Sequence, residues 1–321
     1  MERVLITGAA GFIGSHVLNY LYDKYPKAEF YNLDAMYYCA DHNRIRDEIR
    51  DSAGYHFVKG DLCQYDLLYH LFSSHKFTHV IHFAAQSHVD NSFSNPLQYT
   101  HDNILGTHTL LEVAKTFKSS LKLFVHVSTD EVYGESGDSC KTEQSVLCPT
   151  NPYAATKAGA ELIAQSYRHS YGMPIIITRG NNVYGPKQYP EKVIPKFIEQ
   201  LKNDTPVTIH GDGSALRAFV HVRDVARAFY CILEKGVVGE IYNVGTDTSN
   251  EYSVTQVAHY LIHLIKNIPL DDTDNLEKWM TRVDDRLYND NRYFINTDKM
   301  TNLGWTPEID FLTGLRELTK I

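Results

Sequence analysis

The sequence lacks several features that define other classes of protein. Cysteine is scarce, with five scattered residues in 321 and no C-x-x-C pair, which argues against a disulfide framework and favours a reducing, cytoplasmic environment. No apolar run approaches the length of a membrane span, and the first residues contain no apolar signal core, so no membrane association is expected. The 16 histidines show no H-E-x-x-H spacing, and we expect no bound metal.

An excess of positive charge is also absent. The formal net charge is −8, from 31 Lys and Arg against 39 Asp and Glu. A chain without a basic face is poorly suited to neutralise many phosphates, so nucleic acid is not expected as a partner. The charge balance is compatible with a small anionic ligand, which needs only a few local Arg or Lys side chains.

The first half of the sequence alternates short β-rich runs with amphipathic segments, such as 13–22 and 105–117. This alternation is typical of an α/β fold with a doubly wound parallel sheet and helices on both faces. The runs that we interpret as buried parallel strands are 4–7, 30–34, 56–59, 79–83, 123–128 and 175–179.

A glycine-rich turn follows the first of these runs. Residues 8–14 read Gly-Ala-Ala-Gly-Phe-Ile-Gly, a spacing that lets backbone N–H groups approach a pyrophosphate at a helix N-terminus. Asp34, twenty residues beyond Gly14, can accept both ribose hydroxyls and would repel a 2′-phosphate. The pattern predicts a Rossmann domain that binds NAD, and the alternative is a turn with a capping aspartate. The contacts expected from the turn are Gly8, Gly11, Phe12, Ile13 and Gly14.

Asp61 and Leu62 follow the third predicted strand. At that position an aspartate can reach the adenine amino group, but it can equally well cap the next helix. Both interpretations of Asp61 remain open on the sequence alone.

The sequence changes character after about residue 180. Four prolines fall within 186–206, and short β-rich runs at 207–210 and 219–222 alternate with loops, whereas 241–244 resembles another strand of the sheet. We expect a Rossmann NAD-binding domain at 1–180, to which roughly 218–246 returns. Residues 181–321 would mainly form a smaller substrate-binding lobe.

Tyr153 and Lys157 lie four residues apart, just after Pro152, which suits the first turn of a helix and places both side chains on one face. A tyrosine with the usual pKa of about 10 is a poor base near neutrality. A neighbouring ammonium and a positive nicotinamide ring both favour the phenolate, which can accept a hydroxyl proton while hydride leaves the same carbon. The spacing alone is a common coincidence on helices.

Thr129, Asp130 and Glu131 come directly after a strong β run, at the carboxyl edge of the predicted sheet. Two adjacent carboxyl groups tend to separate their pKa values, which suits one general acid and one general base acting on neighbouring carbons. In isolation the pair would be read as a solvated acidic loop. Beside a predicted cofactor site, we interpret it as catalytic.

Together these motifs resemble the extended short-chain dehydrogenase/reductase superfamily, and within it the nucleotide-sugar 4,6-dehydratases. The resemblance covers nearly the whole chain, and the Thr-Asp-Glu triplet is its specific part. It implies that Tyr153, assisted by Lys157 and Thr129, removes the 4-hydroxyl proton as hydride passes to NAD. Glu131 then removes the C5 proton while Asp130 protonates the departing 6-hydroxyl, and hydride returns to C6. The implied product is a 4-keto-6-deoxy sugar nucleotide.

The resemblance also implies ligand contacts outside these motifs. Further cofactor contacts would come from Phe83, Ala84 and Ala85, and substrate contacts from Ser87, Asn182, Lys192, His210, Arg217, Asn243 and Arg286. Arg292 is a further candidate, although a surface ion pair is the better interpretation for it. A homodimer through the helices that contain 105–117 and 153–171 is implied as well, but their apolar positions equally suit packing on their own sheet.

Some positions depart from the pattern of the bacterial dTDP-glucose enzymes. The segment 286–289 reads Arg-Leu-Tyr-Asn where those enzymes typically have Arg-Pro-Gly-His, and Thr208 and His210 stand where they have Pro and Tyr. By contrast, 90–93 and 179–182 look like the plant-type UDP-glucose 4,6-dehydratases. The resemblance therefore favours UDP-glucose over dTDP-glucose as the substrate.

Two alternative functions remain open at this point. A nucleotide-sugar 4-epimerase would keep NAD, Tyr153 and Lys157 but would have no use for Asp130 and Glu131. A catalytically silent NAD-binding scaffold is expected to have lost at least one of the hydroxyl, the tyrosine and the lysine, and this sequence keeps all three.

Overall fold

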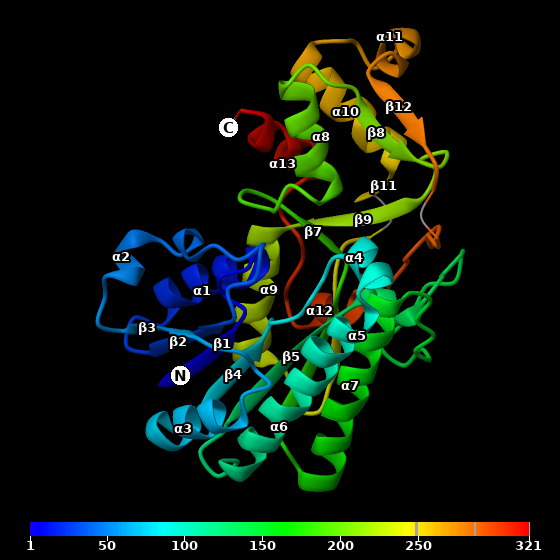
Figure 1. Cartoon of the computed structure of the whole chain (residues 1–321). Coiled ribbons are helices and arrows are strands. Elements are labelled where there is room, and N and C mark those ends of the chain that lie inside the picture. Colours follow the sequence, from blue (N-terminus) through cyan, green and yellow to red (C-terminus); the bar gives the residue numbers. More distant parts are fainter. Residues whose placement is uncertain (248–249, 286, 321) are drawn as a thin grey trace.

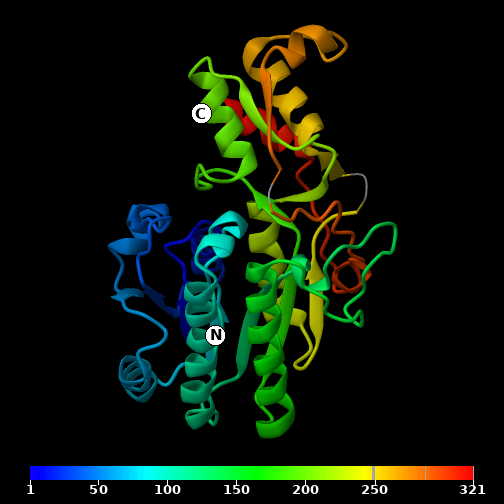
Figure 2. The ribbon, with the colours of Figure 1, turned by 45° about the vertical axis from the view of Figure 1, so that its right-hand side comes forward.

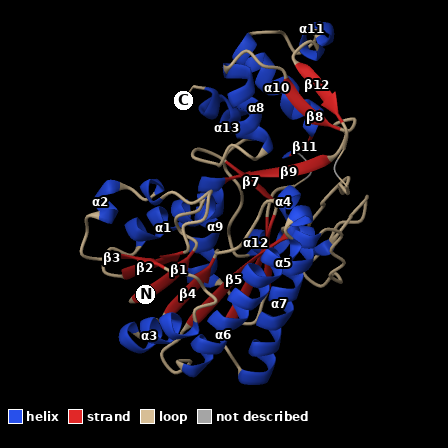
Figure 3. Cartoon of the chain, viewed as in Figure 1, coloured by secondary structure: helices blue, strands red, loops and turns tan. Residues whose placement is uncertain are grey.

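The computed structural model describes residues 1–247, 250–285 and 287–320. Within this part of the chain, a seven-stranded sheet forms the centre of the larger domain (Figures 1 and 3), and each pair of neighbouring strands is parallel. The strand order is β10-β6-β5-β4-β1-β2-β3. The strands are β1 (Arg3–Thr7), β2 (Glu29–Asp34), β3 (Tyr55–Lys59), β4 (His79–His82), β5 (Leu123–Thr129), β6 (Ile175–Gly180) and β10 (Ile241–Val244). Their ends lie within one residue of the predicted runs, and the predicted doubly wound parallel sheet is confirmed.

Helices cover both faces of this sheet. One face carries α1 (Phe12–Lys24) and α9 (Val222–Lys235), and the other carries α3 (Tyr65–His75), α6 (Gly106–Thr116) and α7 (Pro152–Tyr171), with α6 and α7 side by side in Figures 1 and 2. Successive side chains of β1 alternate between the faces, so that Val4 and Ile6 pack in the core under α1 and α9 while Leu5 packs in the core under α3 and α6. The sheet is therefore buried on both sides.

The helix predicted at 105–117 begins at Gly106 and is preceded by a π-helical stretch, η2 (Thr100–Leu105). The wider turn contains Asn103, which is buried. Its Oδ1 accepts from the backbone N of Gln86 at 2.7 Å, and its Nδ2 donates to Thr156 Oγ1 at 2.9 Å. The π-helical stretch thus joins the loop after β4 to α7, two segments that both face the site described below.

The second lobe stands over the carboxyl ends of the parallel strands (Figure 2). It contains a three-stranded sheet of order β11-β9-β7 and a two-stranded sheet, β12-β8, in the described residues. Its core includes Phe197, Ile209, Leu261 and Phe311. The elements are β7 (Asn182–Tyr184), α8 (Val193–Lys202), β8 (Val207–His210), β9 (Leu216–His221), β11 (Glu251–Ser253), α10 (Val254–Lys266), α11 (Thr273–Glu277), β12 (Met280–Val283) and α13 (Phe311–Thr319).

The chain passes between the two lobes more than once. After β9 it returns to the central sheet as α9 and β10, and α12 (Asp298–Asn302) comes back again to pack beside β10. The run predicted at 219–222 is the end of β9, and Val222 already begins α9. The remaining short helices are η1 (His42–Arg44), α2 (Asp47–Arg50), α4 (Val89–Ser94), α5 (Pro96–Tyr99) and η3 (Asp130–Tyr133). Among the described residues, no helix is both long and apolar enough to cross a membrane.

Candidate active site

A cavity of about 520 Å³ lies between the two lobes. The carboxyl ends of the parallel strands form its floor, which is the edge where open α/β sheets bind ligands. The upper lobe contributes residues of α8, β8 and β9. The predicted cofactor, catalytic and substrate residues that line this one cavity are Gly8, Gly11, Phe12, Ile13, Gly14, Asp34, Asp61, Leu62, Phe83, Ala84, Ala85, Ser87, Thr129, Asp130, Glu131, Tyr153, Lys157, Asn182, Lys192, His210 and Arg217.

The glycine-rich turn has no room for side chains. Gly8 has a φ of +76°, and a Cβ there would lie 2.6 Å from the backbone N of Ala84. A Cβ on Gly14 would lie 2.7 Å from the carbonyl oxygen of Gly8. Only glycine therefore permits this close approach of α1, β1 and the loop after β4, and it leaves bare backbone at the helix N-terminus, where a pyrophosphate fits.

Asp34 ends β2 beside this turn. Its Oδ2 accepts from the backbone N of Ala10 at 3.0 Å and its Oδ1 from that of Met36 at 2.9 Å. The side chain is 8% exposed, and burial raises its pKa even though both hydrogen bonds act in the opposite direction. The carboxyl group is thus held in a fixed orientation on the cavity wall, where the second ribose of a dinucleotide would need an acceptor.

Asp61 does not cap the next helix, α3, whose N-cap position is Gln64, but forms a turn ahead of it. Its Oδ1 accepts from the backbone N of Cys63 at 2.8 Å, as a turn-forming aspartate does, and its Oδ2 accepts from the Tyr37 hydroxyl at 3.3 Å. The same side chain lines the cavity together with Leu62. Its role as a turn residue and its availability to a ligand are therefore compatible.

The acidic pair lies where β5 ends and η3 begins. The Thr129 hydroxyl oxygen accepts from the backbone N of Glu131 at 3.3 Å and donates to Asp130 Oδ1 at 3.1 Å. Asp130 is 2% exposed, and burial, followed by the charge of Glu131, raises its pKa to about 7. Burial also raises the pKa of Glu131, against the hydrogen bond that Asn151 donates to it at 3.0 Å. Asp130 is buried and Glu131 is half-buried, and protonating either of these neighbouring carboxyl groups favours ionising the other.

Helix α7 brings Tyr153 and Lys157 to the same wall. Asn151 caps the helix, because its Oδ1 accepts from the backbone N of Ala154 at 2.8 Å, and Pro152 occupies the first turn. Lys157 Nζ donates to the carbonyl oxygen of Val127 on β5 at 2.6 Å. Burial lowers the pKa of Lys157 to about 8. The lysine is thus fixed against the strand that ends in the acidic pair.

The pKa of Tyr153 differs from the sequence expectation. Burial raises it, and the nearby charges of Glu131 and Asp130 act in the same direction, whereas a hydrogen bond with Thr129 opposes them. The sequence led us to expect a pKa lowered by Lys157 and by a positive nicotinamide ring together. With the protein groups alone, burial is the largest cause of the shift, and the charges of the two carboxyl groups add to it.

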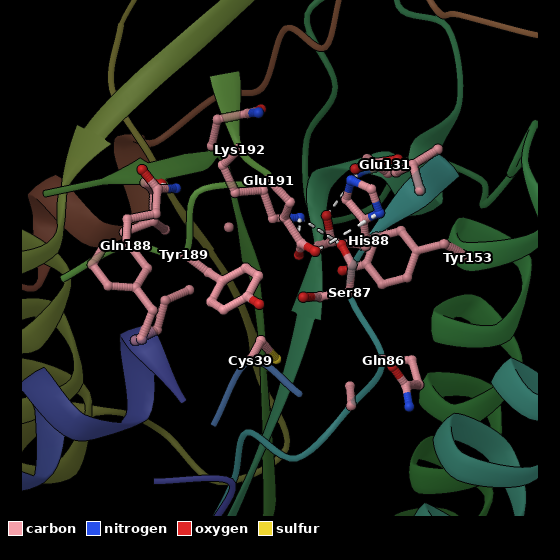
Figure 4. Close-up of a pocket in the computed structure, with 18 of the residues that line it drawn as sticks. Cys39, Gln86, Ser87, His88, Glu131, Tyr153, Gln188, Tyr189, Glu191 and Lys192 are labelled. Atoms are coloured by element: carbon pink, nitrogen blue, oxygen red, sulfur yellow. Dashed lines mark hydrogen bonds and ion pairs between the residues drawn. The ribbon is translucent and has the colours of Figure 1, made fainter. Parts of the chain in front are cut away.

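The opposite wall contains an acid that the sequence motifs did not single out. Glu191 points toward His88 (Figure 4), with 3.9 Å between its Oε2 and the His88 Nδ1, and it accepts a hydrogen bond from the Tyr38 hydroxyl at 2.7 Å. Its neighbour Lys192 donates from Nζ to the carbonyl oxygen of Ser87 at 2.9 Å. The only available signal was the position of Glu191 next to a predicted substrate residue.

The sequence motifs also did not single out three residues of the loop after β12 that contact the site, Asn289, Asp290 and Tyr293. Arg217 Nη2 donates to Asn289 Oδ1 at 3.0 Å and to the carbonyl oxygen of Asp290 at 2.9 Å, and its guanidinium lies 4.8 Å from the centre of the Tyr293 ring. The Tyr293 hydroxyl donates to Asp290 Oδ2 at 2.5 Å and lies 3.5 Å from an oxygen of Glu131. Arg217 therefore orders this loop as well as lining the cavity.

Three of the residues that the sequence suggested as substrate contacts are not placed in the cavity by the structure. Asn243 is fully buried and is not among the described residues that line the cavity. It accepts from the Tyr133 hydroxyl at 2.8 Å and donates to the carbonyl oxygen of Asn296 at 3.0 Å. The prediction that Asn243 contacts substrate is therefore replaced by a packing role for it. Arg286 lies outside the described residues. Arg292 pairs with Glu251 and Asp138, which confirms the interpretation as an ion pair.

Comparison with known proteins identifies the family. The family model described as GDP-mannose 4,6 dehydratase matches residues 5–318, and the chain belongs to this family. A trifunctional UDP-glucose 4,6-dehydratase/UDP-4-keto-6-deoxy-D-glucose 3,5-epimerase/UDP-4-keto-L-rhamnose-reductase of Arabidopsis thaliana is 46% identical over 319 residues, which are 98% of this chain and 46% of that protein. This chain thus spans about half the length of that plant relative.

Two further relatives match over most of their length. A dTDP-D-glucose 4,6-dehydratase of Bos taurus is 45% identical over 316 residues, 98% of this chain and 87% of the relative. A crystal structure of a dTDP-glucose 4,6-dehydratase from Streptomyces venezuelae, with NAD bound, superimposes with a TM-score of 0.91 at 35% identity and covers 99% of this chain and 96% of that one. The fold and the cavity are thus those of a family whose characterised members include nucleotide-sugar dehydratases.

Proposed function

We propose that this chain binds NAD in the cavity between its lobes and dehydrates a nucleoside-diphosphate glucose to the 4-keto-6-deoxy sugar nucleotide. The observation that carries the proposal is the position of Asp130 and Glu131, two adjacent carboxyl groups, one buried and one half-buried, on the same wall as Tyr153. NAD is supported by the bare glycine turn, by Asp34 and by the NAD-bound relative. When bound, NAD supplies the hydride acceptor at C4 and the hydride donor at C6.

The first step assigned to the protein is removal of the 4-hydroxyl proton. Tyr153 takes this proton as a phenolate, which the positive nicotinamide ring of bound NAD would stabilise against the burial that raises the pKa of this tyrosine. Lys157, with a pKa lowered to about 8, supplies positive charge to the region while its donation to Val127 fixes its position. The resulting 4-ketone acidifies the C5–H bond.

The elimination needs one proton acceptor and one proton donor at the same time. Glu131 removes the C5 proton, and Asn151 keeps one of its oxygens oriented by a hydrogen bond of 3.0 Å. Asp130 has a pKa of about 7, so a substantial fraction of it carries a proton near neutrality and can protonate the departing 6-hydroxyl. Glu131 then returns a proton to C5.

The diphosphate is assigned to Asn182, Lys192 and Arg217, since guanidinium and amide donors suit phosphate oxygens. His210 and Thr208, at the upper end of the cavity, would face the base. We favour UDP-glucose over dTDP-glucose on two grounds. One is the similarity to the plant relative named for UDP-glucose. The other is that Thr208 and His210 replace the Pro and Tyr typical of the bacterial dTDP-glucose enzymes. Thymine differs by one methyl group, which contributes only about 1–3 kcal/mol of discrimination in a pocket.

The experiment that tests this function is mass spectrometry of UDP-glucose and dTDP-glucose after separate incubation with the purified protein and NAD, without added reductant. Loss of one water from either substrate, with no net accumulation of reduced cofactor, is the expected result, and faster conversion of UDP-glucose would support the base assignment. Conversion to the galactose isomer without a mass change would instead indicate an epimerase. Tyr153→Phe serves as the matched inactive control, because it removes only the phenolic oxygen.

A homodimer through α6 and α7 is a separate proposal about assembly. Leu105, Leu162 and Tyr171 are exposed apolar side chains on η2 and α7. Light scattering would test it, with Leu162→Glu expected to give monomers. The control is Leu287→Glu, at an exposed leucine on the loop after β12, which should leave the mass unchanged. A monomeric parent protein would contradict the proposal.

A further inference from the structure

Asn181 contacts the proposed acid from the neighbouring strand. It follows β6 directly, and its Nδ2 donates to Asp130 Oδ2 at 2.7 Å, with the two side chains 5% and 2% exposed. An amide nitrogen donates hydrogen bonds and cannot accept them, so Oδ2 acts as the acceptor in both protonation states of Asp130. The contact therefore distinguishes the two oxygens of this carboxyl group.

The orientation of the Asn181 amide is fixed by its surroundings. Its Oδ1 accepts from the backbone N of Thr246 at 3.2 Å, and a backbone N–H can only donate, which assigns oxygen and nitrogen within the amide. A Cβ on Gly245 would lie only 1.9 Å from the same Oδ1. The chain after β10 thus leaves a space that the amide fills in one orientation.

The other oxygen of Asp130 contacts Thr129. Thr129 Oγ1 donates to Asp130 Oδ1 at 3.1 Å and accepts from the backbone N of Glu131 at 3.3 Å. A hydroxyl can donate or accept, whereas an amide NH₂ group can only donate, so Oδ1 is the oxygen of Asp130 that can carry a proton without losing its partner. Thr129 and Asp130 are both buried.

We propose that Asn181 is a positioning residue that keeps the transferable proton of Asp130 on Oδ1, the oxygen that contacts Thr129. The proposal rests on the dehydratase function proposed above. It makes Oδ1 the oxygen that protonates the departing 6-hydroxyl, while Asn181 holds Oδ2 as an acceptor.

The protons balance around this step. Asp130 gives the proton on Oδ1 to O6 as the C6–O bond breaks, and Glu131 gains the C5 proton, which it later returns to C5. The ionised Asp130 then has a donor at each oxygen, Asn181 at Oδ2 and Thr129 at Oδ1. Over one cycle Tyr153 gains the O4 proton and Asp130 loses one, so the site regains its starting protonation when one proton leaves Tyr153 and one reaches Oδ1.

The charges around Asp130 set the direction of the test. Burial and Glu131 raise its pKa, whereas Asn181, Thr129 and the charge of Arg217 lower it. Removing a donor to the carboxylate stabilises the protonated form relative to the ionised one, so the loss of either hydrogen bond should raise the pKa further. A role limited to packing would change stability without this shift.

The first experiment is a pH titration of the NAD-loaded protein by ¹³C NMR with labelled aspartate carboxyl groups, in which Asp130→Asn assigns the resonance. Asn181→Ala and Thr129→Val should each raise the pKa of Asp130 by about one unit, and Thr129→Ser, which keeps the hydroxyl, should not. An unchanged Asp130 pKa in Asn181→Ala would overturn the positioning role. This readout does not depend on turnover.

The second experiment measures the pH dependence of product formation from UDP-glucose and dTDP-glucose. In Asn181→Ala the alkaline limb of kcat should move upward with the Asp130 pKa while KM changes less than twofold, because Asp130 acts in its protonated form. An alkaline limb that stays at the pH of the parent protein would overturn the positioning role.

The parent protein separates the two proposals. If it releases water from either substrate while the variants show none of these effects, the dehydratase function stands and the positioning role is wrong. If the parent protein releases no water from either sugar nucleotide, the function and the positioning role fail together, whatever the carboxyl titration shows.

Discussion

Asn151 donates a hydrogen bond from Nδ2 to Glu131 Oε2 at 3.0 Å while its Oδ1 caps α7 by accepting from the backbone N of Ala154 at 2.8 Å. One side chain therefore connects the helix that carries Tyr153 and Lys157 to the proposed base on η3. The two hydrogen bonds use different atoms, so substitutions can separate the contribution to helix stability from the contribution to the base.

Asn151→Ser should keep the helix cap and lose the donor to Glu131. Serine is about as good as asparagine at this position, so the free energy of unfolding should change little, whereas Asn151→Ala should lose about 1 kcal/mol. Without the donor the pKa of Glu131 should rise above its already raised value. Water elimination should then slow in both variants, as measured by product mass beside urea unfolding. Wild-type elimination rates in Asn151→Ser would contradict a role for this contact.

Glu131→Gln should separate oxidation from elimination. The amide is nearly isosteric with the carboxyl group but cannot accept the C5 proton, whereas Tyr153 and Thr129 keep their positions. Reduced nicotinamide should therefore accumulate to about one equivalent per site, followed in its near-ultraviolet absorbance, while 6-deoxy product falls by about 10²–10⁴-fold. Release of a normal amount of 6-deoxy product would show that another group is the base.

The local motifs of the site were predictable because they depend on spacing along one segment. Each motif was recognised from residues that are close together in the sequence. These motifs are the glycine turn, the acid at the end of β2 and the pair Tyr153/Lys157, and all of them line the cavity. The strand ends were predictable for the same reason, since each buried parallel strand is a short apolar run bounded by polar residues.

The contacts between segments were not predictable in this way. Asn181 reaches Asp130 across 51 positions in the sequence, and Asn151 reaches Glu131 across 20. These contacts depend on the register between β5 and β6 and on the angle at which α7 meets the sheet. Neither the register nor the angle can be read from the spacing of residues along one segment. Asn243 failed as a predicted ligand contact for the same reason, because its place on β10 directs it toward Tyr133.

Stability should depend on pH through Asp130. Its pKa is about 7 in the folded protein, against an ordinary value of 3.8 for an aspartate side chain. A group whose pKa is raised on folding contributes stability that is present below the unfolded pKa and is lost as the pH rises through the folded one, here between about pH 4 and pH 7. Asp130→Asn removes this titration. The variant should therefore gain stability relative to the parent as the pH rises from 4 to 8.

The size of that change is a few kcal/mol, because each pKa unit corresponds to about 1.4 kcal/mol. Thermal unfolding of the parent protein and the variant at pH 4, 6 and 8 would measure it, with Asp138→Asn, at a fully exposed aspartate, as the control. A difference in Tm between Asp130→Asn and the parent protein that stays constant over this range would mean that Asp130 titrates normally in the fold.

A buried ion pair beneath the site gives the strongest prediction for stability. Arg179 on β6 donates to Glu161 on α7 through Nε at 3.1 Å and Nη2 at 2.5 Å, and the side chains are 2% and 0% exposed. Arg179 also donates to the hydroxyl of Tyr133, the last residue of η3, at 2.7 Å. The pair therefore joins the catalytic helix, the central sheet and the turn that carries the two acids.

Glu161→Ala should lower the free energy of unfolding by about 3–5 kcal/mol, because it leaves the Arg179 guanidinium buried without its counter-ion. The double variant Glu161→Leu/Arg179→Met should recover most of that loss, since it leaves no buried charge. Activity need not recover with stability, because Arg179 also orients Tyr133 and Glu161 acts to raise the pKa of Lys157. Urea unfolding beside steady-state kinetics separates the two effects. A double variant as unstable as Glu161→Ala would show that the pair stabilises the fold through its hydrogen bonds, and not merely by neutralising a buried charge.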